Sequence, residues 1–340
     1  MNSPSSFGWA VVGPGRIAHR FAEAVHRLPG MHLAVVHGRD AARTQTFAAH
    51  WTRDGVAPVD ATTSLAEALA RPDVAGVYVA TPHAFHGPAI RAALLAGKAV
   101  LCEKPLVASR AEALPLVELA RERGAFLMEA VWTRFLPLYA TVGAWLREGA
   151  IGPLRGLQSS FCFATTYEPA SRMYDPALAG GALLDVGIYN LTMTRWVLQQ
   201  ALGACPEPSS LQASGRLAPT GVDQRVWATL DFDGIVSQFT CGFDGPADNG
   251  LRIFGERGHI VVPRTFWEAT EAELHVDGQT PVTVQVPFVI NGFEGEVEET
   301  ARGARAGLVE SGVMPHAETL ATLAWMDQIR SQLGVRYPFE

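Results

Sequence analysis

A lysine stands where the sequence predicts the end of a buried parallel strand. The residues 99–104, AVLCEK, are typical of a strand, and Pro105 follows them. Parallel sheets place their ligands beyond the carboxyl ends of their strands, so Lys104 and Glu103 are candidate site residues. A neighbouring cation would lower the pKa of the Lys104 ammonium, which could hold a substrate hydroxyl. A surface Lys-Pro turn explains the same residues equally well.

A carboxylate and a phenol share one face of a predicted helix in the second half of the chain. In GGALLDVGIY, residues 180–189, Asp185 and Tyr189 stand at i and i+4, so both side chains point to one side of a helix. A tyrosine beside a lysine ammonium suits the interconversion of an alcohol and a carbonyl, because the positive charge lowers the phenol pKa. A buried tyrosine with a satisfied hydroxyl is the alternative.

A glycine-rich turn near the start of the chain predicts a dinucleotide site. The turn consists of Gly13, Pro14, Gly15, Arg16, Ile17 and Ala18. It follows an apolar run and opens a helical pattern, as a GxGxxG/A fingerprint requires. Gly13 permits the tight turn, Gly15 the approach of a pyrophosphate, and Ala18 close helix packing. An ordinary glycine-rich turn is the alternative.

The end of the second predicted strand bears on the form of the coenzyme. An acid at this point accepts from a ribose hydroxyl, whereas an arginine pairs with a 2'-phosphate. If Gly38 holds the position of the acid, Arg39 and Arg43 can clamp the phosphate, which favours NADP over NAD. The alternative is a solvated Arg39, with Asp40 meeting the ribose.

The elements that must position these residues alternate through the first 132 residues. Apolar runs predict strands over 7–13, 31–38, 74–81, 99–104 and 125–132. Helical patterns lie between them, over 16–28, 42–51, 63–70, 86–98 and 108–124. This alternation of strands and helices predicts an α/β domain over residues 1–132, a doubly wound parallel sheet of the Rossmann type.

The pattern changes after Trp132 and predicts a second domain over residues 133–340. Period-two alternation indicates strands over 156–166, 211–242, 251–262 and 281–287, with a hairpin turn at Asp233-Gly234. Helices are expected over 180–198 and 317–334. The expected architecture is a second α/β domain on a largely antiparallel sheet.

Composition excludes several classes of partner. The 340 residues carry a formal net charge of -7, so no basic surplus is available for nucleic acid or an anionic membrane surface. No window approaches the ~18 apolar residues of a membrane span. The four cysteines have no metal-ligand or paired spacing, so we expect a reducing cytoplasm. His83 and His86 lack a third ligand of suitable spacing, and no metal is expected.

The motifs together resemble one oxidoreductase family. GPGRIA, ATPHAFH, AVLCEKP, FLMEAVWTRFLP, GGALLDVGIY and RYPFE occur in this order. The chain resembles the Gfo/Idh/MocA family nearly end to end, and most closely its branch of dimeric dihydrodiol dehydrogenases and NADP-dependent D-xylose dehydrogenases. The resemblance implies a Rossmann domain, and a C-terminal domain whose open mixed sheet presents a face that makes a homo-oligomer, with a dimer expected.

The resemblance also implies roles for individual residues. Lys104 matches the family's catalytic lysine, Tyr189 the tyrosine of this branch, and Asp185 the acid that supports it. The positions that the resemblance places along the coenzyme are Thr81, Pro82, His83, His86, Glu103, Trp132 and Arg134. Pro14 and His37-Gly38 are less typical of the family, and they bear on which coenzyme is preferred.

We expect an NADP-dependent dehydrogenase that acts on a secondary alcohol of a sugar or a cyclic diol, with NAD as a possible coenzyme. The cofactor carries the redox chemistry and the protein supplies position and proton transfer. One alternative is a glucose-fructose type oxidoreductase that retains its NADP. The other is a non-catalytic regulator of the same fold, against which Lys104 and Tyr189 argue.

Overall fold

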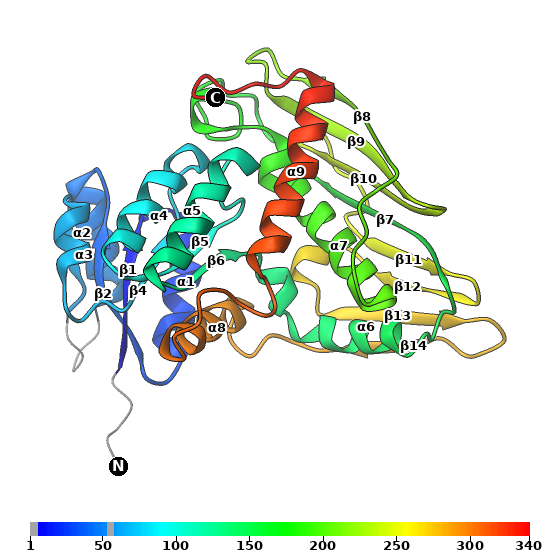
Figure 1. Cartoon of the computed structure of the whole chain (residues 1–340), viewed down its shortest axis with the longest axis horizontal. Coiled ribbons are helices and arrows are strands. Elements are labelled where there is room, and N and C mark those ends of the chain that lie inside the picture. Colours follow the sequence, from blue (N-terminus) through cyan, green and yellow to red (C-terminus); the bar gives the residue numbers. More distant parts are fainter. Residues whose placement is uncertain (1–5, 53–57) are drawn as a thin grey trace. The chain divides into compact units, whose positions relative to one another are not determined.

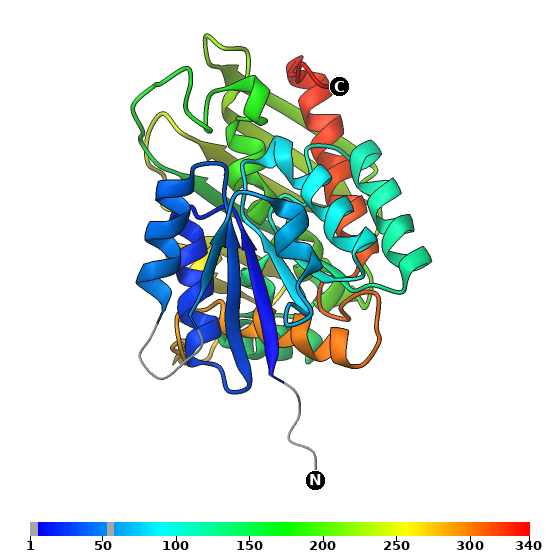
Figure 2. The same cartoon turned by 90° about the vertical axis from the view of Figure 1, so that its left-hand side faces the viewer.

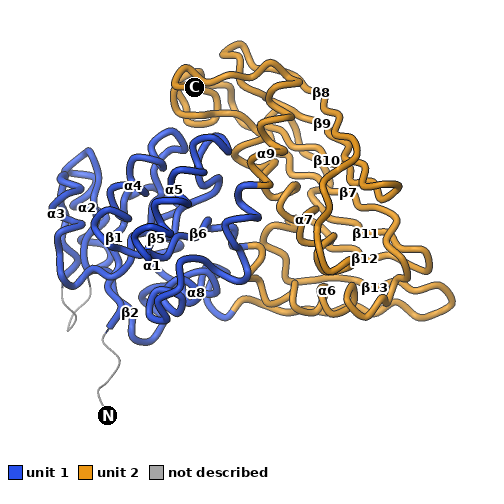
Figure 3. Tube along the Cα trace, viewed as in Figure 1, with its two compact units in different colours: residues 1–132, 289–320 blue, residues 133–288, 321–340 orange. Residues whose placement is uncertain are grey.

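Six parallel strands form the sheet of the first of two compact units (Figure 1 and Figure 3). The computed structural model describes residues 6–52 and 58–340. Unit 1 comprises residues 1–132 and 289–320, and unit 2 comprises 133–288 and 321–340. The strands of unit 1 are β1 (Phe7–Val12), β2 (Met31–His37), β3 (Asp60–Thr62), β4 (Gly76–Val79), β5 (Ala99–Glu103) and β6 (Leu127–Ala130). Their order, β3-β2-β1-β4-β5-β6, is the doubly wound sheet that the sequence predicts.

Helices flank this sheet, as Figure 2 shows with the strands in the middle. They are α1 (Arg16–Arg27), α2 (Ala41–Trp51), α3 (Leu65–Ala70), α4 (His86–Leu95), α5 (Arg110–Arg123) and α8 (Glu294–Arg305), with one-turn helices η1 (His83–Phe85) and η2 (Trp132–Phe135). Helix α8 packs on β5 and on α1. Its Gly303 leaves room for a ring, because a Cβ there would lie 2.2 Å from the Phe126 side chain.

The strand order positions the site of unit 1. The chain places β2 and β3 on one side of β1, and β4, β5 and β6 on the other. Connections from β1 and β4 therefore leave in opposite directions, the arrangement in which open α/β sheets bind their ligands beyond the carboxyl ends of the strands. Strand β1 is buried along its length, and Trp9 packs between Phe7 and Phe21 at centroid distances of 5.0 and 5.1 Å.

Unit 2 is built on an eight-stranded mixed sheet. Its strands are β7 (Leu154–Cys162), β8 (Ser210–Leu217), β9 (Asp223–Phe232), β10 (Ile235–Gly242), β11 (Leu251–Gly255), β12 (Gly258–Val262), β13 (Glu271–Val276) and β14 (Val282–Gln285). The order is β14-β13-β12-β11-β7-β10-β9-β8. Strands β7 and β10 pair in parallel, and the other described neighbours are antiparallel. Asp233 and Gly234 both have positive φ, as the two-residue hairpin turn requires.

One helix of unit 2 is buried on all sides. The helices are α6 (Pro137–Arg147), α7 (Ile188–Leu202), α9 (His316–Leu333, which begins in unit 1), and the short η3 (Pro176–Leu178) and η5 (Phe266–Glu268). Helix α7 contacts β7 and β10 on one side and α6 on the other. Its residues 188–198 are all buried, as expected of a helix enclosed by sheet and helix.

Two details differ from the sequence expectations. The segment 180–198 is not one α-helix: Leu183–Gly187 form a π-helix, η4, ahead of α7. The expected second domain, 133–340, includes the segment 289–320, which packs with unit 1. The spacing of apolar residues does not distinguish a π-helical turn from an α-helical one. It also does not show against which unit a helix packs. No helix among the described residues combines the length and apolar character needed to cross a membrane.

Candidate active site

The glycine-rich turn leaves the start of α1 open to an anion. Gly13 has φ of +100°, and a Cβ on it would lie 2.7 Å from the Ala80 carbonyl oxygen. The turn therefore packs directly against the end of β4, which only glycine allows. Gly15 precedes α1 and supplies no side-chain cap, and the first turn of the helix contains no acid. The first N–H groups of α1 thus point outward for a negatively charged ligand.

The end of β2 presents an arginine rather than an acid. A Cβ on Gly38 would lie 2.4 Å from the Thr44 hydroxyl and 2.9 Å from the Pro14 ring, so this position admits no larger side chain. Asp40 caps α2, since its carboxylate accepts from the Arg43 N–H at 2.9 Å. The Arg39 guanidinium lies over the Phe85 ring, 5.1 Å from its centroid. Phe85 belongs to η1, so this contact joins the β2 end to the loop after β4.

His86 ties two loops of unit 1 together. It is fully buried, and its Nδ1 and Nε2 lie 2.9 and 2.8 Å from the carbonyl oxygens of Pro105 and Thr81. Burial lowers the pKa of His86, which keeps the ring neutral. A neutral imidazole has one N–H, so it donates to one carbonyl and only contacts the other. His83 packs nearby, with its ring centroid 5.7 Å from that of His86.

One buried hydroxyl beside this loop has no partner in the described part of the chain. The Thr81 Oγ1 is inaccessible to solvent and makes no hydrogen bond. It follows β4, next to the Ala80 carbonyl that Gly13 approaches. Pro82, the next residue, precedes η1 with an extended backbone. A hydroxyl without a partner, placed just after β4 where the strand order reverses, suits a polar ligand atom.

Two carboxylates fix the turn that carries Lys104. Tyr78 donates to Glu103 at 2.5 Å, and burial with this carboxylate nearby raises the pKa of the Tyr78 phenol well above its usual value. Glu129, buried on β6, accepts from the Leu106 N–H at 2.8 Å and from the Thr319 hydroxyl at 2.7 Å. The backbone is thus held on both sides of Lys104, which is half-buried at the end of β5.

Trp132 is packed into unit 1 and is only 5% exposed. The Arg20 guanidinium lies 4.5 Å from the centroid of the Trp132 ring, and the ring centroids of Trp132 and Phe293 lie 5.2 Å apart. The indole therefore joins α1 to the segment that leads into α8. It forms part of the wall of this unit near the start of α1.

Unit 2 holds the phenol and its acid. Asp185 lies in η4 and Tyr189 in the first turn of α7, and they are 5% and 7% exposed. The Arg172 guanidinium donates to Asp185 at 3.0 Å. Short π-helical segments are frequent at functional sites, because they re-aim the side chains of one turn. Asp185 thus lies in the π-helical turn just before the helix becomes α-helical at Ile188.

An aromatic wall lies beside Tyr189. Phe161 and Trp267 stack with ring centroids 3.3 Å apart and an interplanar angle of 3°, and Phe161 lies 5.6 Å from Tyr189. The turn that carries Trp267 is anchored by two hydrogen bonds: Thr133 donates to the Trp267 carbonyl at 2.7 Å, and Tyr139 donates to the Phe266 carbonyl at 2.5 Å. A flat apolar surface next to a phenol suits the face of a ring.

The predicted residues therefore form two clusters, one in each unit. In unit 1, hydrogen bonds and close approaches join the fingerprint turn, the β2 end, the loop 81–86 and the turn after β5. In unit 2, Asp185 and Tyr189 lie in consecutive helical segments. Arg134 is buried and donates to the Thr192 carbonyl at 3.3 Å, which ties it to α7. Arg16 and Arg43 are exposed.

Comparison with protein families settles the kind of protein. Residues 7–131 match the model of an oxidoreductase family with an NAD-binding Rossmann fold, and residues 139–261 match the GFO/IDH/MocA C-terminal domain. The chain belongs to the Gfo/Idh/MocA oxidoreductase family. The resemblance inferred from the motifs is confirmed.

Relatives of this Gfo/Idh/MocA oxidoreductase match along nearly the whole chain. Trans-1,2-dihydrobenzene-1,2-diol dehydrogenase of Mus musculus is 34% identical, with 97% of this chain and 98% of the relative covered. The enzyme of that name from Danio rerio is 36% identical, with 97% of each chain covered. A 3-ketoreductase of Actinomadura kijaniata, solved with NADP and TDP-benzene, is 25% identical with a TM-score of 0.83 over 96% of this chain and 98% of that one.

Sequence reasoning missed several residues of this Gfo/Idh/MocA chain that support the site. Trp267 and Glu129 were not singled out, and neither was Phe85 as the partner of Arg39. Glu129 lies inside the apolar run 125–132, and a carboxylate in a buried strand was the available signal. Nothing in the sequence links Trp267 to Phe161, which are 106 positions apart in the chain but stacked in space.

Proposed function

We propose that this chain is an NADP-dependent dehydrogenase that oxidises a secondary alcohol of a sugar or a cyclic diol, with Lys104 and Tyr189 as its acid–base pair. The observation that carries the proposal is the position of Lys104. It follows β5 at the carboxyl end of the Rossmann sheet, and His86 ties its turn to the loop after β4. The sheet therefore offers an ammonium group beside the expected dinucleotide site.

NADP fits the residues of unit 1. The first N–H groups of α1 would hold the pyrophosphate, and the Thr81 hydroxyl is a donor without a partner in the described chain. Asp40 is occupied as the cap of α2, so its role as a ribose acceptor is disfavoured. Arg39, supported by Phe85, and the exposed Arg43 would bind the 2'-phosphate. The related 3-ketoreductase was solved with NADP.

The proton is handled by residues of the chain. Bound NADP supplies the acceptor for the hydride that leaves the carbinol carbon. In the proposed reaction Tyr189 starts as a phenolate that the Lys104 ammonium stabilises, and its oxygen takes the proton of the substrate hydroxyl to become a phenol. Asp185, paired with Arg172, supports the tyrosine. The related 3-ketoreductase was also solved as a lysine-to-alanine and as a tyrosine-to-phenylalanine variant.

The aromatic wall of unit 2 favours a cyclic substrate. The stacked rings of Phe161 and Trp267 offer an apolar face beside Tyr189, suited to the C–H face of a sugar or to a cyclohexadiene diol. The curated relatives are named for trans-1,2-dihydrobenzene-1,2-diol. A cyclic trans-diol is therefore the first substrate to test, followed by aldoses and inositols.

The test is a substrate panel assayed by absorbance of the reduced nicotinamide. Cyclic diols, aldoses and inositols are each offered with NADP and with NAD. We expect turnover of a diol or a sugar with kcat/KM at least tenfold higher for NADP than for NAD. Absence of turnover across the panel, or a preference for NAD, contradicts the proposal.

Two control measurements separate the alternatives. A nucleotide that survives gel filtration and appears on denaturing extraction would indicate a glucose-fructose type enzyme that recycles its NADP between two sugars. Binding of NADP without turnover of any substrate would indicate a regulator. Free exchange of NADP together with turnover supports the dehydrogenase.

The cytoplasm remains the expected location, and all four cysteines are free thiols.

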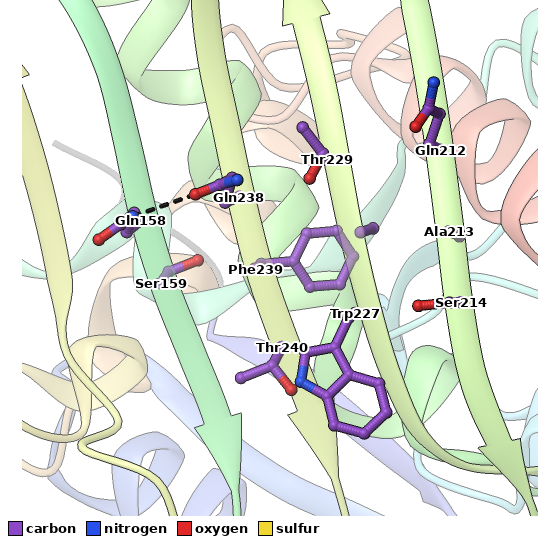
Figure 4. Close-up of a pocket in the computed structure, with 11 residues that line it drawn as sticks. Gln158, Ser159, Gln212, Ala213, Ser214, Trp227, Thr229, Gln238, Phe239 and Thr240 are labelled. Carbon is purple, nitrogen blue, oxygen red and sulfur yellow. Dashed lines mark hydrogen bonds between the residues drawn. The ribbon is translucent and has the colours of Figure 1, made fainter.

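We also propose that the chain forms a homodimer through the open face of its eight-stranded sheet. A hollow runs across β7, β10, β9 and β8, with Trp227 48% exposed at one end (Figure 4). Its amide and hydroxyl side chains include Gln158 and Gln238, which bond to each other at 3.1 Å. A broad exposed sheet face with a large indole is typical of an interface. Light scattering should give a molar mass of twice the 36.5 kDa of one chain. For Trp227→Glu it should give the mass of a single chain.

A further inference from the structure

A buried carboxylate on the sheet caps the segment that leads to Tyr189. Asp223 is the first residue of β9, is fully buried, and accepts from the Leu183 N–H at 2.6 Å. Leu183 begins η4, and the residue before it, Ala182, supplies no side-chain cap. The first N–H groups of a helix need an outside acceptor. Asp223 provides it from a different element, 40 positions along the chain.

Gly181 makes room for this carboxylate. Its φ is +122°, and a Cβ on it would lie 2.4 Å from the Asp223 Oδ1. Both the backbone conformation and the close approach therefore require glycine at this point. The Asp223 Oδ1 is buried with no hydrogen-bond partner in the described structure. The carboxylate is thus committed to the backbone that leads into η4.

A second set of residues holds the same backbone. The Tyr337 hydroxyl donates to the Gly180 carbonyl at 2.7 Å. Tyr337 is in turn fixed by Glu340, whose carboxylate accepts from the Tyr337 N–H at 3.2 Å and from both terminal nitrogens of Arg330, at 3.0 and 2.7 Å. Arg330 is 5% exposed, and its guanidinium lies 4.8 Å from the Tyr337 ring centroid.

We infer that Asp223, Tyr337 and the Arg330–Glu340 pair are positioning residues for catalysis, because they clamp the backbone of Gly180–Leu183 and so aim Asp185 and Tyr189. The inference rests on the proposed function for the reaction in which Tyr189 takes part. Single π-helical turns are rare but occur frequently at functional sites, and the first N–H groups of such a turn need acceptors from outside it. Small displacements of a catalytic group cost large factors in rate, so a loosened clamp slows the reaction without removing a reacting atom.

The first test compares Asp223→Ala with Asp223→Asn. The alanine variant removes the acceptor of the Leu183 N–H, whereas asparagine retains a carbonyl oxygen there. We expect kcat to fall at least tenfold for Asp223→Ala, with KM for NADP within twofold of the parent, and to recover to within threefold for Asp223→Asn. Asp231→Ala, at the other end of β9, is the matched control and should leave kcat within twofold.

A readout independent of activity accompanies the kinetics. Hydrogen exchange followed by mass spectrometry should show faster exchange in peptides covering 181–189 of Asp223→Ala, with peptides of 7–52 unchanged. If the chain turns over none of the panel substrates, the proposed function fails while this measurement still decides the clamp. Unchanged exchange over 181–189 overturns the clamp even if the chain proves to be a dehydrogenase.

Milder variants keep the test valid if Asp223→Ala does not fold. Tyr337→Phe removes one hydrogen bond to Gly180 and keeps the ring, and Glu340→Gln weakens the grip of Arg330. In the double variant we expect a three- to tenfold loss of kcat, faster exchange over 181–189 and an unaltered KM for NADP. A double variant with the parent's kcat overturns the inference, as does Asp223→Ala with kcat within twofold of the parent.

Discussion

The Arg39 guanidinium lies over the Phe85 ring, 5.1 Å from its centroid. Arg39 ends the β2 region and Phe85 belongs to η1 after β4, so the pair spans the two loops that border a dinucleotide in a Rossmann unit. A stacked guanidinium keeps its hydrogen-bonding edge exposed while its orientation is restricted. The restricted Arg39 guanidinium would therefore be oriented to form two hydrogen bonds, in its own plane, to a phosphate.

Replacing Arg39 should change coenzyme preference. A charge-assisted bond to a phosphate contributes about 1.5–3 kcal/mol, which is roughly 10- to 100-fold in binding. For Arg39→Ala we expect KM for NADP to rise by about that factor, with KM for NAD within twofold. Arg39→Lys should recover only part of the loss, because lysine lacks the planar fork. Equal effects on NADP and NAD would contradict a role at the 2'-phosphate.

Removing either member of the acid–base pair should abolish most turnover. We expect Lys104→Met and Tyr189→Phe each to lower kcat by at least ~100-fold, because Tyr189 would accept the transferred proton and Lys104 would stabilise the Tyr189 phenolate. Binding of NADP, measured by fluorescence titration, should persist in both variants. Turnover above one tenth of the parent's in both variants would refute the assignment.

The double variant provides a further check on this pair. Residues that act as a unit have strongly non-additive effects, so the combined loss should be close to that of the more damaging single variant. Independent roles would instead multiply the two factors. The far-ultraviolet circular dichroism of all three variants should match that of the parent, since Lys104 is half-buried and the Tyr189 ring is kept.

Trp267 should govern the substrate and not the coenzyme. Trp267→Ala removes the partner of Phe161 and one wall beside Tyr189. We expect KM for a cyclic diol to rise by about tenfold, since an aromatic contact with its buried area is worth roughly 1–2 kcal/mol. Trp267→Phe should retain most of the affinity. An unchanged KM for every ring substrate, with KM for NADP raised instead, would show that the stack serves another purpose.

Asp223 should impose a pH dependence on stability. Burial is the main cause that raises the pKa of this carboxyl from 3.8 to about 7, with Arg330 opposing the shift. The charges of Cys241 and Tyr337 also interact with it. Between about pH 4 and pH 7 the folded chain holds a proton that the unfolded chain has released, so the contribution of Asp223 to stability falls as pH rises.

The measurement is urea unfolding of the parent and of Asp223→Asn at several pH values. Asparagine cannot ionise, so the free energy of unfolding of the variant should rise relative to that of the parent between pH 4 and pH 7, by a few kcal/mol at most. Above pH 7 the difference between the two free energies should be constant. Below pH 4 Asp223 is protonated in both the folded and the unfolded chain, so its ionisation should add little to the difference in stability between parent and variant. A difference that does not change with pH would mean that Asp223 titrates alike in both states.

Local patterns were sufficient for most of the Rossmann unit. In unit 1, Ser64 caps α3, a position that serine favours. In unit 2, Asp233-Gly234 closes the predicted hairpin. Strand β3, only three residues long, left no readable run in the sequence. The doubly wound parallel sheet of unit 1 was predicted from the alternation of strands and helices, because parallel crossovers have one hand.

Contacts between distant segments could not be predicted. The clamp of Asp223 on Leu183, the stack of Phe161 on Trp267 and the bonds of Glu129 all join residues separated by 20 or more positions. Each depends on tertiary packing, which periodicity and propensity do not encode. The fingerprint, Lys104 and Tyr189 could be proposed from the sequence because each lies in a short motif.

Unit 1 is completed by α8, which the chain supplies only after the sheet of unit 2. During translation the six strands emerge first, and α8 follows on the order of ten seconds or more later at ordinary elongation rates. Until then the nascent first half leaves the Phe126 ring without the helix that packs on it. A messenger truncated after residue 132 would therefore encode a nucleotide-binding half that lacks one of its own walls, and any separation of the two halves must carry residues 289–320 with the first.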